Sequence, residues 1–378
     1  MNQRVLVIGG GPAGSMAAIG LARRGIDTLV FEANRFAGTK LVETLYPEAA
    51  ALLASFGLPM PESTPARARF VGSNGRIRLR VALEGSFGAV DRNRLDTDLR
   101  KAAAAAGAKF ADARVEDIDL RDDGVQVSAG GERHDGAFAI DASGKNPVSM
   151  KNRETQTGQG VLDRRVGAFS HFERPGGFDL DEIAIVAIDG GFGYALPINE
   201  NRICVGISIY AAVVGGAIDE VYWDALGRCP FLTALIDGAD RVLPVLPVKN
   251  CESAHSPIEG DRLLRVGDAL GFRDPFLTDG LSFALETGHE AARLCAESIS
   301  LRRPEFHSYP AFVKRIDAHG RIRAQVDRDR EAALFQPAMA VDPHVSPLLR
   351  GCLFALAGGG AQGWSALRED LNAGRATP

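Results

Sequence analysis

Val5–Gly14, with the sequence VLVIGGGPAG, decides the fold, and Glu32 follows at the end of the run TLVFEA. An apolar strand, a glycine-rich turn, an alanine-rich helix and a second strand ending in an acid form the pattern of a dinucleotide-binding unit. Gly9 permits the sharp turn off the strand, Gly11 lets the backbone approach a pyrophosphate, and Gly14 lets the helix lie close on the sheet. Because the spacing, the helix and the acid all agree, the sequence predicts dinucleotide binding.

The start of the predicted helix supplies the expected contacts with the pyrophosphate. Its first residues, Pro12 and Ala13, lie where unpaired backbone N–H groups and the helix dipole favour negative charge. Glu32, followed by Ala33, lies where a carboxylate can accept hydrogen bonds from both hydroxyls of an adenosine ribose. An acid at this position repels a 2′-phosphate, so the pattern argues against NADP in this site.

Size and composition describe an ordinary globular protein. The chain has 378 residues, of which 46% are hydrophobic and 24% charged, and its formal net charge is -5. This balance gives no electrostatic reason to expect a nucleic-acid partner. The five cysteines show no CxxC pair, which predicts reduced thiols, and the seven histidines show no metal-ligand spacing.

The chain shows no sign of a membrane or an export signal. No stretch approaches the roughly 18–20 apolar residues that a membrane span needs. The first strand begins almost at the first residue, which leaves no room for a signal peptide. We therefore expect a cytoplasmic protein without a membrane span.

Short helices and strands continue through residue 144. Residues 48–56 read as a helix, and residues 66–83 as a hairpin, since Asn74–Gly75 accepts positive φ at both turn positions. Residues 90–107 read as a helix with acids early and bases late. Three strands follow, at 113–120, 125–129 and 137–144. A small meander followed by a strand ending in Asp-Ala-Ser-Gly is typical of a large FAD-binding domain.

The hydrophobic pattern changes in the second half of the chain. Residues from about 150 to 250 contain alternating or apolar strands with few helix signals, which predicts a second, largely antiparallel sheet that gathers the earlier hairpin. Residues 281–300 and 309–335 read as helices.

Residues 263–288, LLRVGDALGFRDPFLTDGLSFALETG, form a second informative stretch. A strand ends just before Asp268, whose carboxylate can accept a hydrogen bond from a ribityl hydroxyl. Pro275 lies shortly before a helix that opens near Gly280 and Leu281. Backbone N–H groups at such a helix start can face the electron-rich edge of an isoalloxazine ring.

Together these motifs resemble a known family. GGGPAG with Glu32, Arg92 in VDRNRLD, the run Asp141–Gly144 and GDALGFRDPFLTDG resemble the FAD-dependent oxidoreductases of the para-hydroxybenzoate hydroxylase fold. The texture, including the loop GTKLVETLYPEAAALLASFGL, is closest to the branch that holds flavin-dependent halogenases and geranylgeranyl-reductase-like proteins. The resemblance implies FAD as the cofactor, with Arg92 near its phosphates or the flavin edge, Lys40 near a phosphate, and the backbone of Val115 near its adenine.

The fold class that the resemblance implies is α/β. It comprises an FAD-binding, Rossmann-like domain with three layers (ββα), an inserted, mostly antiparallel β-sheet substrate domain, and C-terminal helices. We expect the FAD-binding domain at 1–62, 89–150 and 251–300, the substrate domain at 63–88 and 151–250, and a helical segment at 301–378.

The chain differs from this branch at three motifs, and each difference argues against one of the branch's known reactions. Its halogenases use a lysine on a strand after the Glu-Thr-Leu loop, whereas this chain has no lysine between Lys40 and Lys101. The nearest counterpart of their Trp-x-Trp-x-Ile-Pro signature places Phe192 and Tyr194 where the tryptophans would lie. Geranylgeranyl reductases carry a cysteine in the early loop, and this chain has none there.

A flavin monooxygenase needs only a flavin, O2 and a shaped, dry pocket. The predicted function is therefore FAD-dependent oxygenation of an aromatic substrate, either a small molecule or an aromatic group on a carrier or precursor protein. A flavin-dependent halogenase, an FAD-dependent alkene reductase and a partner-bound flavoprotein maturation factor stay as alternatives. Because only one GxGxxG unit is present, we favour electron supply by a flavin reductase over direct supply by NAD(P)H.

No catalytic side chain can be assigned from the sequence. Phe192 and Tyr194 are candidates for a substrate pocket, although aromatic residues on a strand are more often core. His171 and His255 are weaker candidates for an acid or a base. No hydrolytic constellation stands out.

Overall fold

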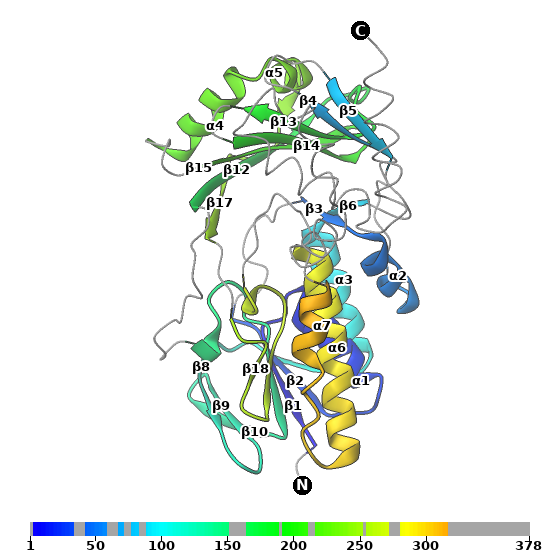
Figure 1. The fold of residues 1–378 in the computed structure, drawn as a ribbon, viewed down its shortest axis with the longest axis vertical. Coiled ribbons are helices and arrows are strands. Elements are labelled where there is room, and N and C mark those ends of the chain that lie inside the picture. The colour runs from blue at the N-terminus through cyan, green and yellow to red at the C-terminus, as the bar shows by residue number, and fades with distance from the viewer. Residues whose placement is uncertain are drawn as a thin grey trace, which may run out of the picture.

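A computed structural model describes residues 3–33, 42–58, 67–71, 77–82, 88–150, 164–188, 191–210, 216–251, 255–271 and 280–316. Two sheets dominate it, and Figure 1 shows them at opposite ends of the molecule with a short strand pair between them. The predicted α/β class is confirmed. Residues 317–335 of the predicted last helix lie outside the described residues.

The first sheet has six strands in the order β18-β19-β11-β1-β2-β7. All neighbours run parallel except β18, which is antiparallel to β19. Its central strands are short and buried, as expected for a parallel sheet covered on both faces. The strands are β1 (Val5–Ile8), β2 (Thr28–Phe31), β7 (Lys109–Ala111), β11 (Phe138–Asp141), β18 (Ile258–Glu259) and β19 (Leu263–Arg265).

Alternation along these strands builds the predicted three layers. Val5 and Val7 face a core that they share with the helices, whereas Leu6 and Ile8 face a core that they share with a small antiparallel sheet. The helices are α1 (Pro12–Ala22), α2 (Pro47–Ser55), α3 (Arg92–Ala105), α6 (Gly280–Leu301) and α7 (Tyr309–Ile316). The small sheet consists of β8 (Val115–Leu120), β9 (Val125–Ala129) and β10 (Glu132–Gly136).

The meander differs from the prediction by one strand. The polar segment Glu132–Gly136 forms a third strand of the meander that the sequence analysis did not identify, and the predicted strand after the meander, β11, joins the parallel sheet beside β1. The reason is local: Gly130 and Gly131 adopt positive φ of 60° and 80° and close a tight hairpin between β9 and β10.

The second sheet follows the path β16-β12-β15-β14-β13-β4-β5, and β17 also pairs with β12. The predicted hairpin forms its far edge, where β4 runs parallel to β13 and antiparallel to β5. The strands are β4 (Arg67–Val71), β5 (Ile77–Ala82), β12 (Arg164–Glu173), β13 (Ile183–Ile188), β14 (Gly191–Asn199), β15 (Arg202–Tyr210), β16 (Asp240–Arg241) and β17 (Leu246–Cys251).

Two helices that the sequence analysis did not expect cover one face of this sheet. They are α4 (Ile218–Gly227) and α5 (Pro230–Ile236), whose apolar side chains share a core with alternate residues of β12, β14 and β15. The other face is turned toward β3 (Val42–Leu45) and β6 (Gly88–Asp91), an antiparallel pair, and β14 contacts β6. Among the described residues, no helix covers the face that the second sheet turns toward β3 and β6; we call it the helix-free face, and we call the part of the molecule built on the first sheet the first unit.

Two further expectations can be compared with the structure. Cys204, Cys229 and Cys295 are buried free thiols, in line with the predicted reduced cysteines. Within the described ranges, none of the helices combines the length and the apolar character needed to cross a bilayer.

Candidate functional site

The glycine-rich turn has the geometry of a phosphate-binding loop. Gly9 has a φ of 102°, and a Cβ there would lie 2.4 Å from the Ala142 carbonyl oxygen. A Cβ on Gly14 would lie 1.9 Å from the Gly9 carbonyl oxygen, so this glycine holds helix α1 against its own turn. Gly11 is different, because a Cβ there would meet no atom of the described residues within 4 Å. The protein itself leaves Gly11 open, which fits a ligand that approaches the backbone there.

Close packing of the helices needs two more glycines. A Cβ on Gly288 of α6 would lie 2.2 Å from the Ala13 carbonyl oxygen, and a Cβ on Gly20 would lie 2.8 Å from the Ala292 Cβ. Pro12 and Ala13 are buried at the start of α1, as the motif requires. The α1–α6 contact therefore fixes the position of the helix N-terminus.

Glu32 is held in place by hydrogen bonds with Gly10 and Arg100 that the sequence did not reveal, and we call this set of contacts the Arg100 clasp. Its Oε2 accepts a hydrogen bond from the Gly10 N–H at 2.8 Å and one from Arg100 Nη2 at 3.2 Å. Arg100 Nε also donates to the Gly10 carbonyl oxygen at 2.7 Å. Glu32 thus holds the Gly10 N–H, and Arg100 holds the Gly10 carbonyl group. The neighbouring Ala33 is exposed.

Arg92 is the centre of a partly buried ion-pair cluster. Its guanidinium pairs with Glu43 of β3 and donates from Nε to Asp96 Oδ1 at 3.0 Å. Burial alone lowers the pKa of Arg92, but the charges of Glu43 and Asp96 outweigh it and raise that pKa above its usual value. The cluster joins β3 to α3, so the predicted cofactor role of Arg92 stays a prediction beside an evident structural one.

The described residues of the second motif lie between the end of β19 in the first sheet and the N-terminus of α6. Asp268 lies half-buried in a short 3-10 turn after β19, and that turn contacts α6. Gly280 and the buried Leu281 begin α6. The Gly267 N–H donates to the Thr287 hydroxyl at 3.0 Å, which ties the turn to the helix. Lys40 and Pro275 lie outside the described residues.

Val115 is the buried first residue of β8, paired with Ala129 in the small sheet. Its side chain belongs to the core between the two β layers. The predicted backbone contact of Val115 with an adenine stays a prediction.

A buried network behind the site was also missed. Arg265 is fully buried, pairs with Glu259, and donates to Ser149 Oγ at 2.7 Å. The Ser149 N–H in turn donates to Asp141 Oδ2 at 2.9 Å. The network fixes the loop after β11, which includes the Asp-Ala-Ser-Gly motif.

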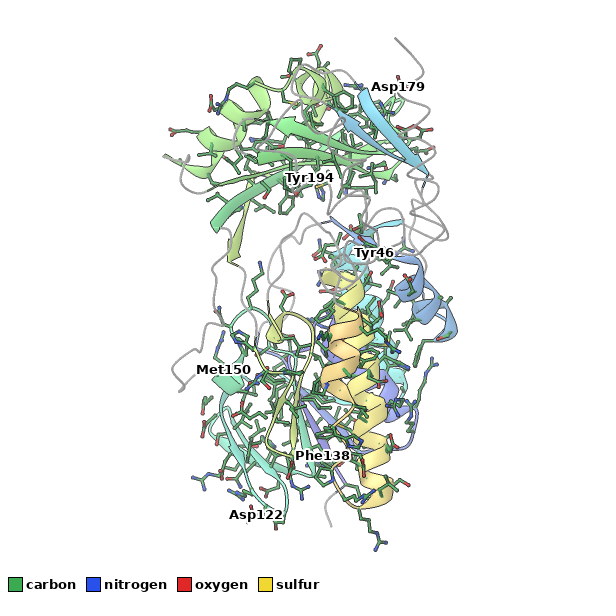
Figure 2. All side chains as sticks on the ribbon, in the orientation of Figure 1. Tyr46, Asp122, Phe138, Met150, Asp179 and Tyr194 are labelled. Carbon is green, nitrogen blue, oxygen red and sulfur yellow. The ribbon has the colours of Figure 1, made fainter. Side chains whose placement is uncertain are left out.

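Phe192 and Tyr194 come together on the helix-free face of the second sheet. Their ring centroids lie 6.3 Å apart, and the Tyr194 ring covers Gly206, where a Cβ would lie 2.2 Å from it. Figure 2 shows Tyr194 on the side of the sheet turned toward the end of the first unit that carries Tyr46. Burial raises the pKa of Tyr194 well above its usual value, and the charge of Glu43 is among the groups that add to the effect. The two rings therefore lie together near β3, and their predicted role in a substrate pocket stays a prediction.

The two candidate histidines occupy different environments. His171 lies on the same face as Tyr194 and is 5% exposed, and its buried Nε2 has no hydrogen-bond partner in the described ranges. Burial and the charge of Arg202 lower the pKa of His171 to about 4, against the opposing charges of Asp91 and Glu173. His255 lies instead near Arg265, where burial and the Arg265 charge lower its pKa. The structure does not bring the two histidines together.

The buried His171 predicts a pH-dependent stability. Since its pKa falls from 6.5 when unfolded to about 4 when folded, the unfolded chain binds more protons between these values. The stabilisation is present above pH 6.5, declines as the pH falls toward 4, and amounts to about 3 kcal/mol at most. We expect His171→Phe to lose less unfolding free energy than the wild type between pH 7 and pH 4.5, as measured by urea denaturation. Equal losses in the two proteins would show that His171 is not buried in its neutral form.

Comparison with known proteins agrees with this geometry. The family model described as lycopene cyclase protein matches residues 4–215. A 1H-pyrrole-2-carbonyl-[peptidyl-carrier protein] brominase of Pseudoalteromonas luteoviolacea is 24% identical over 317 residues, covering 78% of this chain and 77% of that protein. A digeranylgeranylglycerophospholipid reductase of Methanothermobacter thermautotrophicus is 29% identical over 333 residues, covering 80% of each. The expected branch is thereby confirmed.

The solved structures share the fold. The flavin-dependent halogenase CmlS superposes with a TM-score of 0.73 at 23% sequence identity, over 85% of this chain. The chain spans 63% of the length of CmlS. At this identity the likeness shows the fold alone.

Proposed function

Since this chain belongs to the family described as lycopene cyclase protein, we propose that it is an FAD-dependent monooxygenase acting on an aromatic substrate. One observation carries the proposal: a dinucleotide turn left open at Gly11 belongs to the same chain as a helix-free sheet face lined by aromatic side chains. The broader assignment of the chain as an FAD-dependent oxidoreductase is supported by its relatives, which include flavin-dependent halogenases and reductases.

FAD fits the residues of the turn. Gly11 leaves space for a pyrophosphate, the N-terminus of α1 favours its charge, and Glu32 lies at the ribose position of the motif. We propose further contacts with the cofactor from Asp268 in the turn after β19 and from Gly280 and Leu281 at the start of α6. The domain boundaries predicted from the sequence are part of the same proposal. When bound and reduced, FAD supplies the two electrons that activate O2.

The Arg100 clasp gives a testable consequence for FAD binding. We expect Arg100→Met to weaken FAD binding about tenfold, because Glu32 and the Gly10 peptide lose the donor that holds them. If Arg100 acts through Glu32, the same substitution in a Glu32→Gln background should cost much less. Titration of flavin fluorescence in the four proteins gives the coupling, and Arg94→Met, on the same helix but exposed, serves as the control. Additive losses would contradict a shared clasp.

The proposed reaction is oxygenation of a ring. One atom of O2 enters the ring as a hydroxyl, the other leaves as water, and reduced FAD is oxidised by two electrons. The chain's own contribution is to hold a planar ring against the aromatic side chains of this face, Tyr194 among them, and to exclude water from a face that is largely apolar.

Halogenation is the second candidate, and the brominase and halogenase relatives favour it. The absence of a lysine between Lys40 and Lys101 argues against it, since halogenases of this branch use one there. Chemically reduced FAD, O2 and a panel of phenols, indoles and pyrroles test the choice. A hydroxylated product that forms equally well with and without bromide supports our proposal, and a product that requires bromide refutes it.

An alkene reductase is the third candidate, because reductases are among the relatives. It differs in needing no oxygen. Saturation of a double bond by the reduced enzyme under anaerobic conditions would replace our proposal.

We further propose that electrons reach the flavin from a separate reductase. Only one glycine-rich dinucleotide unit is found in the sequence. Anaerobic mixing of the FAD-loaded protein with NADH or NADPH should leave the flavin band near ~450 nm unbleached for minutes. Rapid bleaching by either nucleotide would show direct reduction.

The substrate is proposed to be a free or carrier-tethered aromatic group. The brominase relative acts, by its name, on a pyrrole carried by a peptidyl-carrier protein, which supports the tethered form. A maturation factor that uses flavin on a precursor protein is the non-turnover alternative. Robust turnover on a free phenol without any partner would count against both protein-bound forms.

A further inference from the structure

The helix-free face of the second sheet has an ordered set of side chains. Three cross-strand rows run over β12, β15 and β14, and their central residues are Ser208, Gly206 and Cys204. These rows are Gly167–Ser208–Phe192, Phe169–Gly206–Tyr194 and His171–Cys204–Leu196. We call this set the aromatic face.

Two polar atoms on the aromatic face are buried without a hydrogen-bond partner among the described residues. They are His171 Nε2 and Ser208 Oγ, on residues that are 5% and 1% exposed. Buried polar atoms in folded proteins are nearly always hydrogen-bonded, so an exception on a face turned toward another unit indicates a position that a ligand completes.

The charges around the aromatic face are already paired. Glu173 and Arg202 form an ion pair in the row after His171, and Glu43 pairs with Arg92. Asp91 caps α3 by accepting from the Asn93 and Arg94 N–H groups. Within the three rows, no described side chain carries a formal charge, since burial and Arg202 keep His171 neutral at physiological pH. Such a surface favours an uncharged ligand over a carboxylate.

From this arrangement we infer that the aromatic face selects a neutral aromatic substrate with a hydroxyl group, and that His171 Nε2 hydrogen-bonds this hydroxyl. The inference rests on the proposed function, because it concerns the substrate of that same site. His171 is thus a specificity-determining residue. The ring lies along Phe169 and Tyr194, whose row is next to that of His171.

Ser208 marks the far end of the aromatic face. It lies four strand positions from the residue paired with His171, or about 14 Å along the sheet. A single ring that contacts His171 cannot reach it. Only a longer substrate can contact Ser208 as well as His171.

Binding to the oxidised FAD-loaded protein tests the inference without turnover. The probes are para-cresol, its methyl ether 4-methylanisole, and benzoate, each titrated against the flavin absorbance spectrum. We expect the wild type to bind para-cresol about tenfold more tightly than 4-methylanisole, as one hydrogen bond allows, and to bind benzoate more weakly than either.

His171→Phe keeps an aromatic ring and removes the hydrogen-bonding nitrogen. We expect the preference for para-cresol to fall to about one because para-cresol affinity is lost, while 4-methylanisole affinity stays unchanged. His289→Phe is the matched control, since His289 Nδ1 is also buried without a partner but lies on α6 against Phe56. If His171→Phe does not retain FAD, His171→Leu makes the same comparison.

The outcomes separate this inference from the proposed reaction. An unchanged preference in His171→Phe or His171→Leu, no preference in the wild type, or tighter binding of benzoate overturns the role of His171. Binding with the expected preference but no oxygenation of para-cresol supports the inference and counts against the monooxygenase. If neither ring perturbs the flavin spectrum of the wild type, both proposals fall.

Discussion

Replacing Gly11 by alanine is expected to leave the protein folded and to weaken FAD binding by about 100-fold or more. In the part of the chain that the structure describes, a Cβ at this position meets no atom within 4 Å, and the backbone φ of -73° suits any residue. The folded protein therefore loses nothing, whereas a pyrophosphate on the turn meets the added methyl group. Flavin fluorescence titration measures the affinity, and thermal melting of the FAD-free protein measures the fold.

Gly14→Ala is the contrasting variant. Its Cβ would lie 1.9 Å from the Gly9 carbonyl oxygen, so we expect a loss of stability even without FAD. Equal FAD affinity in the wild type and Gly11→Ala would mean that the cofactor does not approach this turn.

Arg92→Met is expected to lower the free energy of unfolding by about 3–5 kcal/mol. The substitution removes the cation and leaves Glu43 and Asp96 beside each other without it, in a place where their side chains are largely shielded from water. Urea denaturation of the FAD-free protein measures the loss, so that any contact of Arg92 with the cofactor does not enter.

Two comparisons make the Arg92 result specific. Arg94→Met, at an exposed position two residues along, should change the unfolding free energy by less than about 0.5 kcal/mol. Adding Glu43→Gln and Asp96→Asn to Arg92→Met should recover part of the loss, because no unpaired charge is then buried. A loss below about 1 kcal/mol for Arg92→Met alone would contradict a structural role for the ion-pair cluster.

The local patterns of the chain were sufficient for most of the fold. Val5–Ile8, the glycine turn and α1 follow from strict local rules: a buried strand, a positive φ at Gly9 and a proline at the first helical turn. The β4–β5 hairpin was also predictable, although its pairing with β13 joins residues more than 100 positions apart. Here the alternating pattern predicted the strand, and the texture of residues 150–250 predicted the sheet that receives it.

The missed helices had a signal that strand patterning around them obscured. Ile218–Gly227 begins with two acids, Asp219 and Glu220, and buries Val221, Tyr222, Ala225 and Leu226 at helical spacing. The missed strand β10 had none, since its sequence ERHDG is polar and its partner is set by the glycine turn before it.

The residues of the site also fall into a group that the sequence predicted and a group that it did not. The glycines and Glu32 were predictable because a ligand fixes their spacing. Arg100 and Arg265 were not, because each contacts groups that the fold brings from distant parts of the chain, 90 residues away for Gly10 and 116 for Ser149. Their roles depend on tertiary packing, which no local pattern records.

The central claim, oxygenation of an aromatic ring by this FAD-dependent oxidoreductase, is tested most directly by a single turnover with labelled oxygen. The FAD-loaded protein is chemically reduced, mixed with para-cresol in bromide-containing buffer, and exposed to oxygen-18 gas. Our account predicts a hydroxylated ring that carries one oxygen-18 atom, with the second atom in water, and no bromine in the product. A brominated ring, or a hydroxylated ring without the label, would contradict it.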